Sequence, residues 1–260
     1  MAEGDTVFRW ARKLEQAFDG RKILSAEAPS ARSPLRRTVA RLNGLHLDRA
    51  ESRGKHLILQ FHGGLALHAH MGMSGGWYVY EPGQRWKRQR QTAWLVMCLT
   101  GDDLPPLEVV QFGGPTLRLV RKVELGRDSR LACLGADLLD PDFDVERGAE
   151  ALRAAGPMEL GEALLDQHRL AGIGNIFKSE SCFEARLNPW RPVSSFSFDE
   201  LTMVVEIARD QLKVGVDTGQ RPHRIYRMAG KPCPRCSHLV KSRGQGLDSR
   251  ITYWCGFCQT

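Results

Sequence analysis

Apolar residues recur at helical spacing near the start of the chain, at Val7, Ala11, Leu14 and Phe18. This spacing predicts a helix, which Gly20 is expected to end. The next hundred residues contain short apolar or alternating runs separated by glycine and proline pairs, a pattern typical of strands. The predicted strands are residues 56–61, 65–71, 76–81, 92–99 and 116–125. We expect them to form an antiparallel sandwich or barrel.

The pattern changes at Pro141, after which apolar residues return to helical spacing. Helices are predicted over 145–155, 159–168, 175–186 and 198–214. The tail from Arg224 is rich in Gly, Pro and Cys and too short for a core of its own, so it needs a metal to fold. We therefore predict an α+β multidomain protein with parts at 1–140, 141–223 and 224–260.

Charge sharpens the picture of the tail. The chain of 260 residues has a formal net charge of +7, and residues 219–260 contain eight Lys or Arg against one acid, Asp248. Such a surplus favours a polyanionic partner. No apolar run is long enough to cross a membrane, and no secretory signal opens the chain. We expect a cytoplasmic protein, close to the bacterial nucleoid.

Four of the seven cysteines form two CxxC pairs, Cys233/Cys236 and Cys255/Cys258. Two such turns can close a tetrahedral site around one Zn²⁺, so we predict a structural zinc finger rather than disulfides. The three other cysteines are expected to be small buried apolar residues: Cys98, Cys133 and Cys182.

Between the two CxxC pairs lies a predicted hairpin that carries Lys241, Arg243 and Arg250. These cations could meet phosphates or a DNA groove. The alternative is a zinc clip that only stabilises the tail.

A glycine-rich turn joins two of the predicted helices. Gly172 and Gly174 precede Asn175, where the second helix should begin. Exposed backbone N–H groups at such a helix start would bind phosphate, and Asn175 could add side-chain contacts. The same residues would also suit an ordinary helical hairpin, and His168 beside them a packing or capping role.

Taken in order along the chain, these motifs resemble the formamidopyrimidine-DNA glycosylase/endonuclease VIII (Fpg/Nei) family. The resembling segments are residues 3–7, 53–57, 70–75, 164–175, 225–233 and 250–259. The opening Glu-Gly-Asp-Thr-Val favours the endonuclease VIII branch. Residues 111–116 favour the same branch, because the purine-directed branch usually has an Arg-Arg-Phe loop at this position and this chain has no such pair of arginines.

The resemblance implies an N-terminal helix on a β-sandwich, a helix–two-turn–helix domain and a zinc finger. It also implies a monomeric, bifunctional DNA glycosylase and AP lyase. Such an enzyme flips the damaged nucleotide out of double-stranded DNA, removes oxidised bases and cleaves abasic sites by β,δ-elimination. Pyrimidine lesions are the favoured substrates.

The family nucleophile is the amine of an N-terminal proline, exposed once Met1 is removed, but position two here is Ala2. The resemblance assigns acid/base chemistry to Glu3 and a phosphate contact near the lesion to Lys55. An alanine imine must be protonated to match a proline iminium, so we predict weaker lyase activity, and none if Met1 stays.

Three further positions match DNA contacts of the family. Met73 matches a residue that fills the gap left in the duplex, although a buried core methionine would look the same in sequence. Asn175 and Arg250 match residues that hold phosphates on either side of the flipped nucleotide. Two rival functions stay open: a damaged-DNA or abasic-site binding protein without catalysis, which Ala2 favours, and a zinc-ribbon transcription or replication factor.

Overall fold

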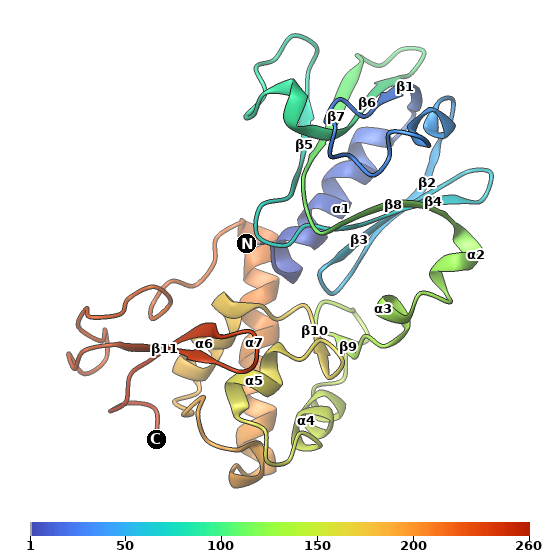
Figure 1. Ribbon diagram of the computed structural model, residues 1–260. Helices are drawn as coiled ribbons and strands as arrows, with labels where there is room; N and C mark the ends of the chain where they lie inside the picture. Colours follow the sequence, from blue (N-terminus) through green and yellow to red (C-terminus); the bar gives the residue numbers. More distant parts are fainter. Residues whose placement is uncertain (1) are drawn as a thin grey trace. The chain divides into compact units, whose positions relative to one another are not determined.

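The computed structural model describes residues 2–260, which separate into two compact units (Figure 1). The sandwich unit consists of residue 2 and residues 6–132, and the helical unit of residues 3–5 and 133–260. The expected processing of Met1 lies outside the described residues.

The sandwich unit contains two four-stranded antiparallel sheets, which confirms the predicted sandwich. The first sheet has the order β1 (Lys22–Glu27), β6 (Ala93–Thr100), β7 (Leu107–Phe112) and β5 (Gly76–Tyr80). The second has the order β2 (Leu47–Arg53), β3 (His56–Phe61), β4 (Leu65–His70) and β8 (Thr116–Arg121). Alternating side chains of both sheets are buried together in one apolar core.

Helix α1 (Gly4–Phe18) supplies the predicted apolar stripe to this core, and Gly20 follows it with a φ of 66°. The predicted strand 116–125 is too long, because β8 ends at Arg121 and α2 (Lys122–Leu125) follows. Glu124 accepts a hydrogen bond from the backbone N–H of Arg121, which favours a helix start there. The remaining short helices are α3 (Ser129–Ala132), η1 (Val39–Leu42) and η2 (Arg90–Thr92).

The helical unit contains the four helices that the sequence predicts. They are α4 (Val145–Arg153), α5 (Leu160–Leu165), α6 (Asn175–Glu184) and α7 (Phe198–Thr218). Helices α4 and α6 pack against α7 around a second apolar core (Figure 1). The parallel pair β9 (Ala136–Asp137) and β10 (Leu170–Ala171) and the turn η3 (Val193–Ser195) complete this part.

The tail forms an antiparallel hairpin of β11 (Lys241–Gln245) and β12 (Arg250–Trp254), and β12 packs against α6 (Figure 1). Its small core holds Ile225, Val240, Cys233 and Cys255 together with Phe183 of α6. The core of the tail is therefore completed by an aromatic side chain of the helical part.

Two expectations about single residues change. Cys182 is buried as predicted, but Cys133 is exposed and Cys98 is half-buried. Cys133 follows α3 in a loop, although apolar residues flank it in sequence, and Cys98 points to the more open face of β6. Within residues 2–260, no helix has the length and apolar character that crossing a membrane requires.

Candidate functional site

Residue 2 lies in the sandwich unit, against the loop between β4 and β5. The backbone N–H of Ala2 donates to the carbonyl of Gly72 at 3.3 Å, and its side chain packs on the apolar core. Gly72 has a φ of 55°, and a Cβ there would lie 2.9 Å from Pro115. The tight loop presents Met73, which is 62% exposed. The alternative of a core methionine is therefore wrong.

Lys55 lies in the turn between β2 and β3, directly after Gly54, whose φ is 56°. It is half-buried and close enough to His56 and His70 to lower the pKa of both histidines. These two histidines face each other across β3 and β4, with ring centroids 4.9 Å apart. Burial is the largest cause of their low pKa values, and His56 falls to about 3. Near neutral pH both rings are uncharged beside a cationic lysine.

A chain of hydrogen bonds fixes which nitrogen of His56 carries the proton. Arg118 Nη2 can only donate, so it donates to His68 Nδ1 at 3.0 Å. The neutral His68 then carries its hydrogen on Nε2 and donates to His56 Nδ1 at 2.9 Å. His56 is left with an N–H at Nε2. Arg118 itself is held by an ion pair with Asp128.

Glu3 belongs to the helical unit, where it is fully buried against the first turn of α6. Its carboxylate accepts hydrogen bonds from the N–H groups of Ile176 at 3.0 Å and Phe177 at 3.4 Å. A carboxylate at a helix N-terminus is stabilised by these amides and by the helix dipole.

The glycine-rich turn was expected to expose its amides to phosphate, and that expectation is wrong for Gly172. Its N–H is buried and donates to Gln167 Oε1 at 3.1 Å. The amides of Ile176 and Phe177, in the first turn of α6 that follows, donate to the internal carboxylate of Glu3.

Lys178, one turn further along α6, is a buried cation that the sequence did not single out. Its Nζ donates to Thr252 Oγ1 at 2.5 Å, and the Thr252 hydroxyl donates to Gln245 Oε1 at 2.6 Å. Burial lowers the pKa of Lys178 to about 8, although the charge of Glu3 acts in the opposite direction. This polar chain connects α6 with both strands of the finger hairpin.

Asn175 and Arg250 are brought close together through the hairpin. Asn175 Nδ2 donates to the carbonyl of Ile251, the residue after Arg250, at 2.7 Å. The Asn175 side chain is buried, and its Oδ1 has no hydrogen-bond partner among residues 2–260. The Arg250 side chain is 46% exposed and lies 3.8 Å from Asp248. It is thus presented to solvent on a hairpin that α6 holds in place.

The four cysteines of the finger meet at one point. Their Sγ atoms all lie within 4.8 Å of one another, with 3.9 Å between Cys233 and Cys258 and 3.5 Å between Cys236 and Cys255. A tetrahedral ion with metal–sulfur bonds of about 2.3 Å requires sulfur–sulfur distances of roughly 3.8 Å. The arrangement therefore fits one four-coordinate metal ion.

Several cations of the tail form ion pairs with acidic residues of the helical unit. Arg221 binds the buried Asp5 through two contacts of 2.6 and 2.5 Å, while Arg224 and Arg235 pair with Glu184. The hairpin cations Lys241, Arg243 and Arg250 are exposed, as predicted. Two further exposed cations of the tail, Arg227 and Lys231, lie before the hairpin.

Sequence reasoning missed the pair His56 and His68 and the buried Lys178. His68 and His70 occur two residues apart in a strand, which places both on one face, and that spacing could have drawn attention to them. Lys178 follows Asn175 within the predicted helix and gives no such signal.

Comparison with known proteins agrees with this geometry. The Formamidopyrimidine-DNA glycosylase N-terminal domain model matches residues 1–108, and the H2TH domain model of the same family matches residues 134–226. "Probable endonuclease 8 2" of Streptomyces coelicolor is 39% identical over 269 residues, covering 100% of this chain and 94% of the relative. "DNA-(apurinic or apyrimidinic site) lyase Nei2" of Mycolicibacterium smegmatis is 34% identical over 100% of this chain and 99% of the relative.

Solved structures show the same fold. Lactococcus lactis Fpg in complex with abasic-site DNA has a TM-score of 0.84 at 21% identity, with full coverage of both chains. Thermus thermophilus MutM (Fpg) has a TM-score of 0.80 at 26% identity, covering 99% of this chain and 98% of that one. A zinc-ribbon transcription or replication factor does not account for matches over the whole chain. The chain belongs to the formamidopyrimidine-DNA glycosylase/endonuclease VIII family.

Proposed function

We propose that this protein is a DNA glycosylase and AP lyase that acts on oxidised pyrimidines and abasic sites through the amine of residue 2. The observation that carries the proposal is the position of Ala2. Its backbone N–H donates a hydrogen bond to the carbonyl of Gly72, which belongs to the loop that presents the exposed Met73. Relatives over the full chain are named endonuclease 8 and AP lyase, which supports catalysis over damage binding alone.

The amine chemistry follows from ordinary pKa values. An α-amine has a pKa of about 7.7–8.0, so roughly a tenth of it is neutral at pH 7 and can attack C1′ of the sugar. At a damaged nucleotide this attack breaks the bond between C1′ and the base and releases the base, whereas at an abasic site the amine adds to the C1′ aldehyde and water is lost. Either route gives, with the sugar ring open, an imine whose protonated form withdraws electrons and acidifies the C2′ hydrogen. β-Elimination expels the 3′ phosphate, and a second elimination releases the 5′ phosphate. Water finally hydrolyses the imine and returns the amine.

Glu3 is proposed to exchange protons with the sugar during ring opening. Because Glu3 directly follows residue 2 in the sequence, it is close to the attacking amine. The hydrogen bonds from Ile176 and Phe177 hold its carboxylate in one orientation. Lys55, with the neutral His56 and His70 beside it, is proposed to contact a phosphate near the lesion.

Recognition is proposed to divide among the predicted parts 1–140, 141–223 and 224–260. Met73 would fill the space that the flipped nucleotide leaves. Arg250 would hold a phosphate from the finger hairpin, and Asn175 would fix that hairpin in addition to any contact of its own. We propose Zn²⁺ as the structural ion of the four cysteines, because a closed thiolate site of this spacing suits zinc.

Residue 2 provides the decisive experiment. Borohydride is added to mixtures of the protein and abasic duplex DNA, and the N-terminal mass is measured in parallel. Protein free of Met1 should give a covalent adduct at Ala2, and Ala2→Pro should give it faster. A variant that retains Met1, Ala2→Gln, should give none. Absence of any adduct with a Met1-free protein would refute residue 2 as nucleophile.

A damage-binding protein without catalysis remains the second candidate, because Ala2 departs from the family proline. It predicts selective retention of abasic DNA with no strand cleavage, even by Met1-free protein. Substrate choice is tested separately with thymine glycol and 8-oxoguanine opposite cytosine. Faster excision of 8-oxoguanine would contradict the assignment to pyrimidines.

A further inference from the structure

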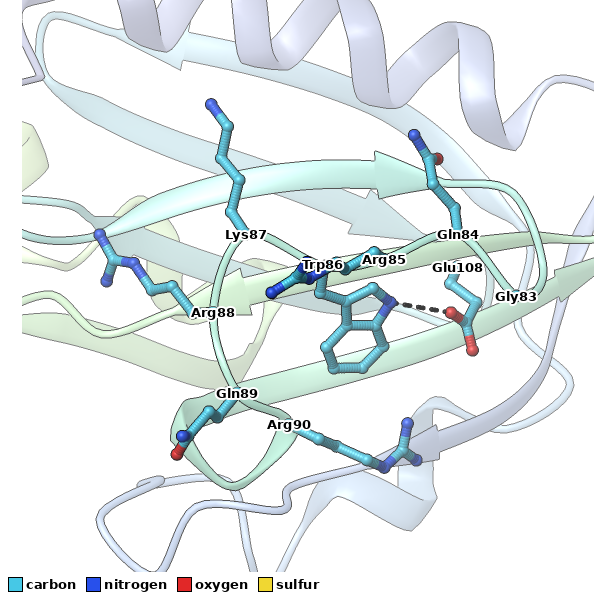
Figure 2. Close-up of a pocket in the computed structure, with 9 residues that line it drawn as sticks. All are labelled: Gly83, Gln84, Arg85, Trp86, Lys87, Arg88, Gln89, Arg90 and Glu108. Atoms are coloured by element: carbon cyan, nitrogen blue, oxygen red, sulfur yellow. Dashed lines mark hydrogen bonds between the residues drawn. The ribbon is translucent and has the colours of Figure 1, made fainter.

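The loop between β5 and β6 is the most strongly basic short segment of the sandwich unit. Within eight residues, 83–90, it carries four cations and no acid: Arg85, Lys87, Arg88 and Arg90. All four side chains belong to exposed residues, and the loop lines an open hollow of about 630 Å³ (Figure 2). None of the proposed site residues lies in this loop.

Aromatic packing holds the loop in shape. Trp86 stacks on Tyr80 with ring centroids 5.9 Å apart and meets the edge of Phe112 at 6.3 Å. Its indole N–H donates to Glu108 at 3.0 Å, as Figure 2 shows. The phenol oxygen of Tyr80 accepts a hydrogen bond from the backbone N–H of Lys87 at 3.1 Å. A loop fixed in this way loses little entropy when it binds a partner.

Most of its cations are not neutralised within the protein. Arg90 pairs with Glu27 at 2.6 Å, and Glu108 is engaged by Trp86. For Arg85, Lys87 and Arg88, no ion pair exists with any residue from 2 to 260; Lys87 and Arg88 lie over aromatic rings instead. In Figure 2 their side chains spread in different directions rather than converging on one point.

We propose that this basic loop, residues 83–90, is an additional contact for the phosphate backbone of duplex DNA, outside the lesion site. Spread cations suit successive phosphates better than one small anion. The loop offers no exposed large apolar side chain, which a peptide partner would need as an anchor. Trp86 is half-buried, with Tyr80 stacked on its ring and Arg90 lying over the ring, which does not favour stacking on a single-stranded base.

The inference rests on the proposed function, because it takes the duplex that carries the lesion as its ligand. Strand β5 separates the basic loop from the loop of Met73 and contains five residues. At about 3.3 Å per residue, the two loops are roughly 17 Å apart along the strand. That distance equals about five base pairs of B-DNA at 3.4 Å each. The contact should therefore require DNA that extends beyond the lesion by about that length.

The test measures binding of undamaged and abasic duplexes by fluorescence anisotropy between 50 and 200 mM salt. The variant Arg85→Gln/Lys87→Gln/Arg88→Gln removes three charges from the loop. As matched control, Arg36→Gln/Arg37→Gln/Arg41→Gln removes three exposed charges elsewhere in the same unit. We expect the loop variant to lower the slope of log affinity against log salt by up to about three, and affinity by about tenfold or more. The control should resemble the wild type.

Arg85→Glu serves as a second variant, because Arg85 has no aromatic contact among those found in residues 2–260 and its exchange should leave folding intact. Shortening the duplex flank below about five base pairs should abolish the difference between this variant and the wild type.

Three results would overturn the proposal. The first is equal salt slopes for the wild type and the loop variant. The second is a loss of affinity in the loop variant that is confined to single-stranded DNA. The third is that the loop variant loses binding to a labelled Glu-rich peptide while its duplex binding is unchanged. Borohydride trapping reports on the proposed function independently. A changed salt slope without any trapped adduct would leave the DNA contact standing and remove the lyase.

Discussion

Gly174 tests whether the first turn of α6 holds the Glu3 carboxylate. Its φ of −116° is open to any residue, so Gly174→Ala introduces no backbone strain. A Cβ at this position would, however, lie 2.6 Å from Glu3 Oε1 and closer still to the carboxyl carbon. Because the added Cβ and the buried carboxylate cannot occupy the same space, the Glu3 side chain must move away from the helix start.

The magnitude follows from the two hydrogen bonds that are lost. A hydrogen bond to a charged group contributes roughly 1.5–3 kcal/mol, and the longer bond of 3.4 Å to Phe177 counts at the low end. Replacing glycine by alanine restores roughly 0.4–1 kcal/mol through the unfolded chain. The expected net loss in free energy of unfolding is about 3 kcal/mol. AP lyase activity should fall with it, because the displaced carboxylate no longer has a fixed orientation.

Urea unfolding followed by circular dichroism gives the stability, and the initial rate of borohydride trapping gives the activity. Gly126→Ala is the matched control, since a Cβ there meets nothing within 4 Å and the backbone is helical. It should change stability by less than about 1 kcal/mol. If Gly174→Ala unfolded at the same urea concentration as this control and trapped abasic DNA equally fast, α6 could not be what holds Glu3.

Three further changes probe the other parts of the molecule. Removal of the metal by a chelator, or Cys236→Ser, should unfold the tail and abolish DNA binding; metal analysis should give one zinc per chain, and binding that survives its loss would contradict a structural role. Burial lowers the pKa of His68 to about 4 in the folded state, so the unfolded chain takes up the proton first as pH falls below about 6.5. His68 should contribute up to about 3 kcal/mol to the decrease in stability between pH 6.5 and 4, in addition to the contributions of His56 and His70, whose pKa values are also lowered, and an equally steep decrease in His68→Gln would exclude His68 as a cause. Thr252→Val should cost about 1–3 kcal/mol and weaken DNA binding through the hairpin, whereas Thr202→Val, which loses one bond within α7, should change binding little.

Local patterns explain which elements the sequence predicts well. The run 56–61 is largely apolar and coincides with β3 at both ends, and the ligand spacing of the finger is set within single CxxC turns. By contrast, β2 reads Leu-Asp-Arg-Ala-Glu-Ser-Arg and has only one fully buried residue, Ala50. Its strand conformation comes from pairing with β3, which is a tertiary interaction and leaves little trace in its own composition.

The same limit applies to the candidate site. The family motifs select Glu3, but that its carboxylate accepts the N–H of Ile176 depends on residues 173 positions apart. Lys178 is similar: a lysine in a helix is usually exposed, and only the packing of β12 on α6 makes it a buried cation. Contacts between distant segments decide both cases, and the pattern of residues in a single sequence does not reveal them.

The buried carboxylate of Glu3 and the buried cation Lys178 of α6 bear on whether the protein is an enzyme or only a binder. Moving an ion such as Glu3 or Lys178 out of water costs several kcal/mol, and apolar side chains of similar size often stabilise a protein more. Binding a phosphate requires exposed cations such as Arg250. A buried carboxylate at the N-terminus of α6 does not contribute to it. Deviations of this kind concentrate at sites where chemistry takes place. The enclosed Glu3, held by two amides and adjacent in sequence to the residue proposed as nucleophile, therefore favours catalysis even though that residue is alanine.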